Sequence, residues 1–266
     1  MDQHLIDLLP NGYVSYNPIT TCENNQIVQK GQKAVVIISG GMDSTVLAYL
    51  VKALGYEPTL LSFNYGQRHK KELTFATITA KKLESVHHIV DLSGIQGLLA
   101  GSALTSDIDV PEGHYSADNM AITVVPNRNA IMLSIAYGHA VSIGARAVYA
   151  GVHAGDHAQY PDCRLNFFQE LDQALYTGNE GFGDIEIRAP FIEKSKADIA
   201  DIGKRLGVPF EDTWSCYKGG EKHDGRCATC VERLQALYEA GAEDKTVYED
   251  PTAWKKIVAD WDAGKR

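Results

Sequence analysis

The sequence predicts an α/β protein built on a parallel, doubly wound sheet. Short apolar runs rich in β-branched residues alternate with segments whose apolar residues recur at the spacing of a helix face. Because these strands and helices alternate with short connections, the strands are expected to run parallel. The first run, Val35–Ile38, ends abruptly at Gly40-Gly41, and a helical pattern follows at once. Ligands in such sheets bind beyond the carboxyl ends of the strands, so we expect the functional residues there.

The composition is that of an ordinary globular protein. With 266 residues, 44% of them hydrophobic and 22% charged, the chain has room for one large α/β domain or a domain with an appendage. No apolar run is long enough to span a bilayer and no secretion signal begins the chain, so we expect a cytoplasmic protein. The formal net charge of −9 disfavours broad, salt-driven binding to nucleic acid. We therefore expect a small-molecule substrate, with no direct nucleic-acid or membrane partner.

The expected elements follow one another along the chain. In order, the strands are expected at 35–38, 59–63, 86–90, 147–152 and 185–190, and the helices at 46–54, 70–83, 131–136, 167–175 and 196–206. Residues 1–32 contain turn signals and a short amphipathic stretch, and we interpret them as an N-terminal extension. Residues 101–120 lack periodicity, as is typical of a long binding or covering loop. We divide the rest into a nucleotide-binding domain with substrate loops, 33–210, and a C-terminal region, 211–266.

The loop Ser39–Ser44 reads Ser-Gly-Gly-Met-Asp-Ser and lies between the first strand and its helix. Its glycines allow positive φ and close approach of the backbone to a ligand, and the helix N-terminus behind them attracts anions. A Walker A loop would need G-x-x-x-x-G-K-[ST], and a dinucleotide fingerprint would need G-x-G-x-x-G; both are absent. The structural alternative is an ordinary Ser or Asp helix cap after a glycine turn.

Cations follow two of the other strands. Arg68 and His69 come after the second strand, where they meet an anion or belong to a solvated loop. Lys194 and Lys196 flank the start of the last helix of the predicted sheet domain. A helix N-terminus does not need a lysine, so these side chains face either an anion or solvent.

Arg128 follows a turn fixed by Pro126, at the start of the helix expected around residues 131–136. From there its side chain is well placed to reach a phosphate or a carboxylate. Helix capping by Asn127 or Asn129 is the structural alternative for this stretch.

An unusually polar segment follows the fourth strand, and we interpret it as a loop that reads the substrate. Its polar residues include His153, Asp156, His157, Tyr160, Asp162, Cys163 and Arg164. Two histidines four residues apart would share a metal only on a helix, which Gly155 disfavours. A nucleophilic pair of Cys163 with a histidine is the catalytic alternative, although no spacing in the sequence fixes its geometry.

Five cysteines, an odd number, favour metal binding or a reactive site over a disulfide framework in a cytosolic chain. Three of them, Cys216, Cys227 and Cys230, gather in one short stretch. They supply three thiolates of a zinc site, and Asp224 or His223 supplies the fourth ligand. Cys227 and Cys230 as a redox pair, or a knuckle without metal, are the alternatives.

Taken together, these stretches resemble the 7-cyano-7-deazaguanine synthase family. The resemblance covers residues 33 to about 240 and rests on these motifs: 39–44, a PP-loop sequence; 63–69, Phe-Asn-Tyr-Gly-Gln-Arg-His; 125–129, Val-Pro-Asn-Arg-Asn; 160–164, Tyr-Pro-Asp-Cys-Arg; and 215–217, Ser-Cys-Tyr, with the knuckle downstream. It implies a Rossmann-like fold of the PP-loop, adenine nucleotide α-hydrolase-like type with helices on both faces of the sheet. It also implies a small C-terminal zinc knuckle and a homodimer.

The resemblance further implies an ATP-dependent C–N ligase. ATP would activate the carboxylate of 7-carboxy-7-deazaguanine as an acyl-adenylate, ammonia would give the amide, and a second activation would give the nitrile. The cofactors implied are ATP, Mg²⁺ and Zn²⁺. From motif position we assign ATP and pyrophosphate to Ser39, Gly40, Gly41, Met42, Asp43 and Ser44, with Phe63, Arg68 and His69; catalysis to Asp43, Ser44, Arg128 and Lys194, with Asp224 in a divergent member; the deazaguanine to Asp156, Tyr160, Asp162, Cys163 and Arg164; and zinc to Cys216, Asp224, Cys227 and Cys230.

The chain departs from the family pattern at three places. Asp224 stands where the pattern has a zinc-binding cysteine, Asn127 stands where it has glycine, and residues 1–32 extend the N-terminus. Asp224 as a free base or amine-positioning group would suit a divergent paralogue that stops at the amide or joins the acid to another amine, even one on a protein, as in antiviral defence. Rival classes are a tRNA-acting PP-loop enzyme, which the −9 charge disfavours, and a non-catalytic zinc-knuckle interaction protein, which would not need the intact loop.

Overall fold

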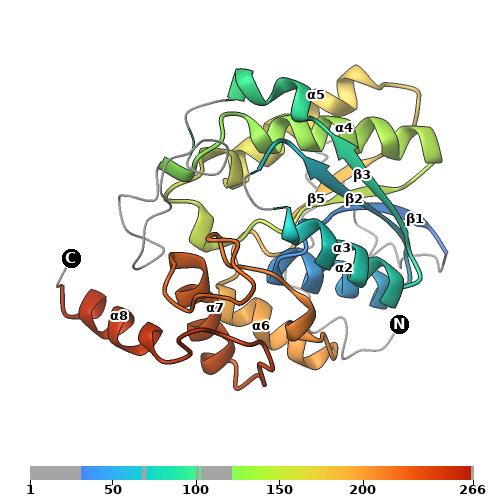
Figure 1. Ribbon diagram of the computed structural model, residues 1–266. Coiled ribbons are helices and arrows are strands. Elements are labelled where there is room, and N and C mark those ends of the chain that lie inside the picture. Colours follow the sequence, from blue (N-terminus) through green and yellow to red (C-terminus); the bar gives the residue numbers. More distant parts are fainter. Residues whose placement is uncertain (1–30, 68–69, 100–101, 103–121, 265–266) are drawn as a thin grey trace.

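The computed structural model describes residues 31–67, 70–99, 102 and 122–264 (Figure 1). The N-terminal extension, with its short amphipathic stretch, lies outside the described residues except at its end. Arg68 and His69 also lie outside them, as does the loop at 101–120 apart from Ser102.

Five parallel strands form the sheet, as the sequence predicts. They are β1 (Lys33–Ile37), β2 (Glu57–Asn64), β3 (Val86–Asp91), β4 (Ala147–Tyr149) and β5 (Glu186–Arg188), in the order β3-β2-β1-β4-β5. β1 is the central strand, and the chain crosses between its two neighbours, so a ligand crevice opens beside it. β4 ends earlier than expected, at Tyr149. Gly151 beyond it packs closely against Ser44, where a Cβ would be 3.4 Å from the Cα of Ser44.

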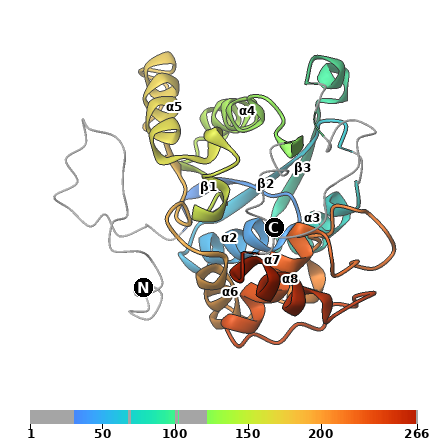
Figure 2. The ribbon, with the colours of Figure 1, turned by 90° about the vertical axis from the view of Figure 1, so that its left-hand side faces the viewer.

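The described chain has seven helices, of which six cover the sheet and the last packs outside them (Figure 1). They are α2 (Met42–Ala53), α3 (Lys71–Lys82), α4 (Arg128–Ile143), α5 (Leu165–Gly178), α6 (Lys196–Arg205), α7 (Ala228–Glu239) and α8 (Ala253–Asp262). Short 3₁₀ turns occur at Ser93–Leu99, Ala154–Asp156, Pro161–Cys163 and Phe210–Asp212. Figures 1 and 2 show α2, α3, α6 and α7 on one face of the sheet, and α4 and α5 on the other. The predicted two-faced arrangement is confirmed.

The central strand divides its side chains between two cores. Val36 packs with the cluster that includes α2 and α6, whereas Val35 packs with the cluster that includes α4 and α5. Both valines are fully buried. This is the alternation expected of a strand covered on both faces, and it explains why β1 reads as a continuous apolar run.

The C-terminal region continues the packing of the sheet domain. Ala236 and Leu237 of α7 join the same core as α2 and α6. Arg233 on α7 is fully buried and donates hydrogen bonds to the Phe210 carbonyl oxygen (2.7 Å) and to Asp244. The boundary near residue 210 remains a prediction, and buried contacts cross it. Within the part of the chain that the model describes, no helix is both long and apolar enough to cross a membrane.

Candidate active site

A cavity of about 270 Å³ opens at the carboxyl ends of β1, β2 and β4. Its wall comes from five connections: the glycine loop, the segment after β2, the start of α4, the segment after β4, and the residues around the cysteines. Lys196 at the start of α6 completes one side. The cavity lies beyond the carboxyl ends of the strands, where the sequence predicts the functional residues. We call the part beside the glycine loop the phosphate end and the part around Arg128 the substrate end.

The glycine loop is shaped by contact with α3. Gly40 has φ +94°, and a Cβ there would lie 2.1 Å from the Glu72 carbonyl oxygen, so only glycine fits. Its own carbonyl oxygen accepts a hydrogen bond from Trp214 N (2.8 Å). Gly41 has φ −74°, so the left-handed backbone expected of the two glycines occurs at Gly40 alone. A Cβ at Gly41 would crowd Ser39 Oγ at 3.2 Å, which is a milder constraint.

The loop serines brace the loop and do not cap α2. Ser39 Oγ accepts a hydrogen bond from Gly41 N (3.1 Å), and Ser44 Oγ accepts one from Ser39 N (3.2 Å). No described side chain caps the N-terminus of α2 at Gly41, which speaks against the ordinary Ser or Asp cap. The first-turn amides therefore face the cavity without a side-chain acceptor, as an anion site requires. The Met42 side chain packs into the core, which leaves its backbone for the phosphates.

Four charged or titratable groups meet at the phosphate end. Lys196 Nζ lies 3.1 Å from Asp43 Oδ2 and 2.8 Å from Glu232 Oε2, and His153 Nε2 lies 3.8 Å from Asp43 Oδ2. Burial alone would raise the pKa of Asp43, but Lys196 and His153 hold it below its usual value. Burial would lower the pKa of Lys196, and the charges of Asp43 and Glu232 outweigh it. Both Asp43 and Lys196 are therefore charged at neutral pH.

The second carboxylate oxygen of Asp43 has a different environment. Among the described residues, Asp43 Oδ1 is buried and has no hydrogen-bond partner. A buried oxygen of an ionised carboxylate needs a donor or a cation. A hard, oxygen-seeking cation such as Mg²⁺ fits this position beside a phosphate site.

Lys196, and not Lys194, lines the cavity. The sequence leaves both lysines open, and the assignment of a catalytic cation to Lys194 is corrected by this geometry. Lys194 precedes the capping box of α6, in which Ser195 Oγ accepts from Asp198 N (3.1 Å), and its charge acts on Asp198. The box fixes where α6 begins and turns the next lysine, Lys196, toward Asp43.

The substrate end is built around Arg128. Its guanidinium lies 5.9 Å from the ring centroid of Tyr65, and Tyr217 and Tyr160 also surround it. Asn127 before it has φ +53°, in the left-handed region. That backbone explains why glycine suits the position in the family pattern and why asparagine is tolerated. Asn127 begins α4 without a side-chain cap, so the structural alternative for this stretch does not apply at Asn127.

Glu72 on α3 is a cavity residue that the sequence reasoning missed. Burial raises the pKa of its carboxyl to about 7, and the nearby charge of Arg128 offsets this only in part. In the sequence, Glu72 looks like an ordinary acidic residue in the first turn of a helix. Tyr65 and Tyr217 were also missed as site residues, although both lie inside motifs that the sequence analysis singled out.

Some residues of the polar segment after β4 line the cavity, and others support its wall from outside. Asp156 and Tyr160 line the cavity together with Phe63 of β2. Arg164 does not: its Nε donates to the His157 carbonyl oxygen (2.8 Å) outside the cavity. The geometry therefore gives Arg164 a structural contact in place of the predicted substrate contact.

Cys163 and Asp162 tie this segment to α4. Asp162 Oδ2 accepts a hydrogen bond from Asn129 N (3.1 Å), and Asn129 Nδ2 lies 3.2 Å from Cys163 Sγ. Cys163 lines the cavity, whereas Asp162 supports it from behind. Burial raises the pKa of the Cys163 thiol, and the charges of Asp156 and Asp162 raise it further. A protonated thiol is a poor nucleophile, so a Cys–His catalytic pair is not supported.

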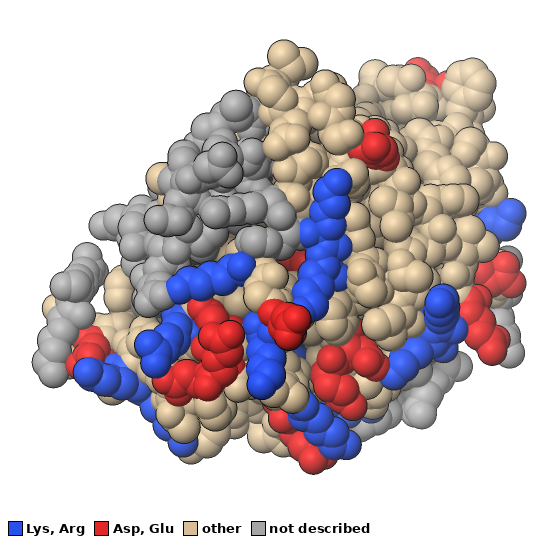
Figure 3. Space-filling model, in the orientation of Figure 1, with Lys and Arg blue, Asp and Glu red and all other residues tan. Residues whose placement is uncertain are grey.

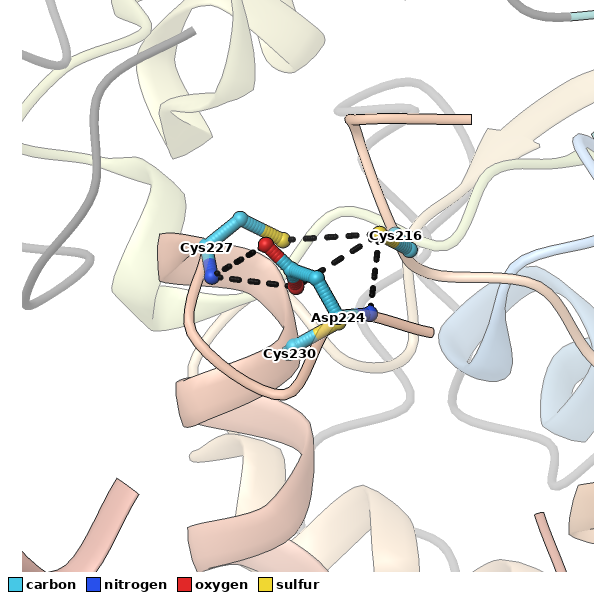
Figure 4. A group of neighbouring side chains, drawn as sticks. All are labelled: Cys216, Asp224, Cys227 and Cys230. Carbon is cyan, nitrogen blue, oxygen red and sulfur yellow. Dashed lines mark hydrogen bonds between the residues drawn. The ribbon is translucent and has the colours of Figure 1, made fainter. Parts of the chain in front are cut away.

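Three thiols and a carboxylate converge beside the cavity, as Figure 4 shows. Ligand atoms of Cys216, Asp224, Cys227 and Cys230 all lie within 4.8 Å of one another, and all four residues are buried. The Sγ atoms of Cys216 and Cys227 are 3.9 Å apart. Tetrahedral zinc with Zn–S bonds of about 2.3 Å separates its sulfur ligands by about 3.8 Å, so this donor set fits Zn²⁺.

The choice between Asp224 and His223 as fourth ligand is decided by packing. The His223 ring lies against Trp214, with centroids 4.2 Å apart, and its Nε2 accepts a hydrogen bond from Ser215 N (3.1 Å). The Asp224 carboxylate accepts from Cys227 N (3.1 Å) and faces the thiols. Asp224 does not line the cavity, although Cys216 does. The geometry thus supports Asp224 as a metal ligand and not as a base.

Charges of both signs are interspersed on the face of the molecule drawn in Figure 3. Lys and Arg side chains alternate there with Asp and Glu, mostly over its lower part, and form no continuous basic surface in this view.

Comparisons with known proteins point in one direction. The model of the family described as "Queuosine biosynthesis protein QueC" matches residues 33–241. The 7-cyano-7-deazaguanine synthase of Paracoccus denitrificans is 49% identical, over 86% of this chain and 98% of that protein. The enzyme of the same name from Brucella anthropi is 51% identical, over 85% and 97%. Among solved structures, NMN synthetase from Francisella tularensis aligns with a TM-score of 0.47 and 16% identity, over 99% of this chain and 92% of that chain, a likeness too distant to bear on function.

Proposed function

The chain belongs to the queuosine biosynthesis protein QueC family, whose members are ATP-dependent ligases, and from that premise we propose that it converts 7-carboxy-7-deazaguanine and ammonia into 7-cyano-7-deazaguanine. One observation supports this most strongly. A single cavity joins a complete Ser39–Ser44 loop, suited to phosphates, to an end where Arg128 lies among aromatic rings, suited to a planar acid.

At the phosphate end, the substrate carboxylate attacks the α-phosphorus of ATP and pyrophosphate leaves. The loop amides and the Lys196 ammonium stabilise the charge on the phosphate oxygens, because they are oriented before the reaction begins. Asp43 would hold Mg²⁺, which would supply further neutralisation of the phosphate charge. Asp43 stays ionised in this site because Lys196 and His153 lower its pKa, so it keeps a lone pair for the cation.

At the substrate end, Arg128 pairs with the carboxylate of the deazaguanine. Its guanidinium is permanently charged and can hold both carboxylate oxygens at once. The rings of Phe63 and Tyr65 provide apolar faces for the flat base, and Asp156 and Tyr160 provide polar edges.

The proposed reaction takes two activations, and its atoms balance. In the first, ammonia displaces AMP from the acyl carbon and loses one proton, which gives the amide. In the second, the amide oxygen attacks the α-phosphorus of another ATP, and loss of AMP with both amide protons leaves the nitrile. Each turnover to nitrile thus consumes two ATP and sends both carboxylate oxygens into AMP.

Cys216, Asp224, Cys227 and Cys230 would hold Zn²⁺ at the start of α7. We propose a structural role, since four protein ligands leave no open coordination position. The cation would fix the chain that carries Cys216, Tyr217 and Thr229 to the cavity wall.

Asp224 also favours one alternative function. If this carboxylate left the metal and served an amine, the enzyme would stop at the amide or join the acid to another amine. The contacts of Asp224 with the Cys227 amide and the thiols hold it at the cysteine cluster. We therefore place the nitrile reaction ahead of this alternative.

The test is to incubate the purified protein with ATP, Mg²⁺ and 7-carboxy-7-deazaguanine, with and without ammonium, and to identify the products by mass spectrometry. We expect nitrile and AMP with ammonium. Amide as the final product, or a deazaguanine adduct on a protein, would replace our proposal with the alternative. Absence of AMP in both incubations would refute adenylation of this acid.

A further inference from the structure

Glu232 makes a close contact with the cation of the phosphate end. Its Oε2 accepts a hydrogen bond from Lys196 Nζ at 2.8 Å, shorter than the 3.1 Å between that ammonium and Asp43 Oδ2. The side chains of Lys196 and Glu232 are only 13% and 16% exposed. The two residues are 36 positions apart and belong to different helices, α6 and α7, so tertiary packing brings them together.

Lys196 needs such a partner because of its chemistry. A lysine ammonium is a point charge on a flexible four-carbon stem, so nothing in the side chain itself fixes its position. Asp43 draws it toward the loop from one side, and Glu232 holds it from the other. The charge of Asp156 also acts on it from the cavity wall. Two direct carboxylate contacts at fixed places leave Lys196 one orientation, beside the loop that binds phosphate.

The room for Glu232 is made by Gly155. A Cβ at Gly155 would lie 2.7 Å from the His153 ring and 3.2 Å from Glu232 Oε1, the second distance being tighter than nine in ten real Cβ contacts. Gly155 N meanwhile donates to His153 Nδ1 (3.1 Å), which orients the imidazole whose other nitrogen faces Asp43. The turn after β4 therefore accommodates Glu232 and orients His153 together.

The place of Glu232 is set by the first turns of α7. Thr229 Oγ1 donates to the Ser215 carbonyl oxygen (2.7 Å), and fully buried Arg233 donates to the Phe210 carbonyl oxygen (2.7 Å). Cys227 precedes the helix and Cys230 lies in its first turn, so the candidate metal ligands fix the same stretch. Glu232 thus comes from one of the best anchored backbone segments near the cavity.

We propose that Glu232 is a positioning residue, which holds the Lys196 ammonium at the phosphate end and so couples the start of α7 to the activation of ATP. This inference rests on the proposed function. It concerns only the ATP half of the reaction, because Glu232 does not line the cavity itself and reaches the site through Lys196.

The test compares Glu232→Gln and Glu232→Asp with the wild-type enzyme. The first keeps the shape and loses the charge; the second keeps the charge and withdraws it by one methylene. Both should lower kcat/KM for ATP by about 10- to 100-fold, the range typical when a partner that orients a functional ligand is lost. The KM for 7-carboxy-7-deazaguanine should not change. Glu239→Gln, on the same helix but exposed and paired with Gln235, is the matched control and should behave as wild type.

A double-mutant cycle separates positioning from a general structural effect. If Glu232 acts through Lys196, then Glu232→Gln added to Lys196→Met should cause no further loss. Equal losses in both backgrounds, or wild-type kcat/KM for ATP in both Glu232 variants, would overturn the inference. Thermal unfolding midpoints identify a variant that does not fold. If the double variant does not fold, the single variant Glu232→Asp still tests the inference. Failure of the proposed function would give a different result from failure of this inference, because the wild-type enzyme itself would then form no AMP.

Discussion

The two ends of the cavity each contain a partly buried carboxyl group, and the surroundings shift the pKa values of the two groups in opposite directions. At the phosphate end, Lys196 and His153 lower the pKa of Asp43 against the effect of burial. At the substrate end, burial raises the pKa of Glu72 to about 7, and Arg128 opposes this only in part. The difference lies in the nearby cation. The Lys196 ammonium lies 3.1 Å from Asp43, whereas Arg128, the cation that acts on Glu72, is surrounded by tyrosines.

This difference separates two tasks. A site for phosphate and its cation needs fixed charges, and the phosphate end keeps Asp43 and Lys196 ionised throughout the neutral range. A site that receives a carboxylate and then an amine benefits from a group that can change its protonation near pH 7. Substitutions at the two ends should therefore affect different properties of the protein.

Asp43→Asn should have the largest effect. It removes the negative charge that would hold Mg²⁺ and that pairs with Lys196, so AMP formation should fall by about 10²- to 10³-fold, the usual cost of losing one preorganised electrostatic contact. Binding of 7-carboxy-7-deazaguanine, measured by calorimetry, should persist because the substrate end is intact. Undiminished AMP formation would rule out a role for the loop in adenylation.

Glu72→Gln should change how stability depends on pH. A carboxyl whose pKa is raised from 4.5 to about 7 by folding stabilises the protein fully below pH 4.5, and this contribution is lost as pH rises through 7. The variant should therefore gain stability relative to wild type between those values, by no more than about 3.4 kcal/mol at 1.36 kcal/mol per pKa unit. Urea unfolding from pH 4.5 to 8 measures the difference. Parallel curves for the two proteins would show that Glu72 titrates normally.

Arg128→Lys should weaken the substrate end alone. Lysine keeps the charge but cannot hold two carboxylate oxygens in a fixed plane. Because one charge-assisted hydrogen bond contributes about 1.5–3 kcal/mol, the KM for the acid should rise by about 10- to 100-fold. The KM for ATP serves as the internal control and should stay the same; an equal rise in both would mean that the two ends do not work separately.

Substitutions of Asn127 should have the smallest effect of the four. Its φ of +53° suits glycine and asparagine, so Asn127→Gly should leave thermal stability and the KM for the acid nearly unchanged. Asn127→Ala should cost about 1–2 kcal/mol in the free energy of unfolding, the price of a left-handed backbone at a residue with a Cβ. Equal stability of the two variants would mean that the turn before Arg128 relaxes to another conformation.

More of the phosphate end than of the substrate end could be predicted from the sequence, but only for the residues that are consecutive in the chain. Residues 39–44 are consecutive, so their motif, the strand before them and the helix after them could all be recognised locally. The choice of Lys196 over Lys194 depends on where the Ser195 cap starts α6, and Glu232 reaches the site from another helix. Neither has a local signal, because both follow from packing between helices.

At the substrate end, motif position indicated Arg128 and Tyr160, yet not the environment that defines their chemistry. Glu72 looks like a routine first-turn acid until packing buries it near Arg128. Likewise, spacing alone allowed either Asp224 or His223 to complete the cysteine cluster, and contact with Trp214 decides between them. Burial and ring packing are long-range properties, which explains why these roles were out of reach of the sequence.

In the proposed reaction, this cavity transfers the adenylyl group of ATP to the carboxylate of 7-carboxy-7-deazaguanine. The most direct measurement uses that acid labelled with ¹⁸O in both carboxylate oxygens, with ATP, Mg²⁺ and ammonium, and follows the label by mass spectrometry. We predict that each AMP released carries one ¹⁸O atom and that the nitrile carries none. Unlabelled AMP, or ADP formed together with labelled phosphate, would contradict the account.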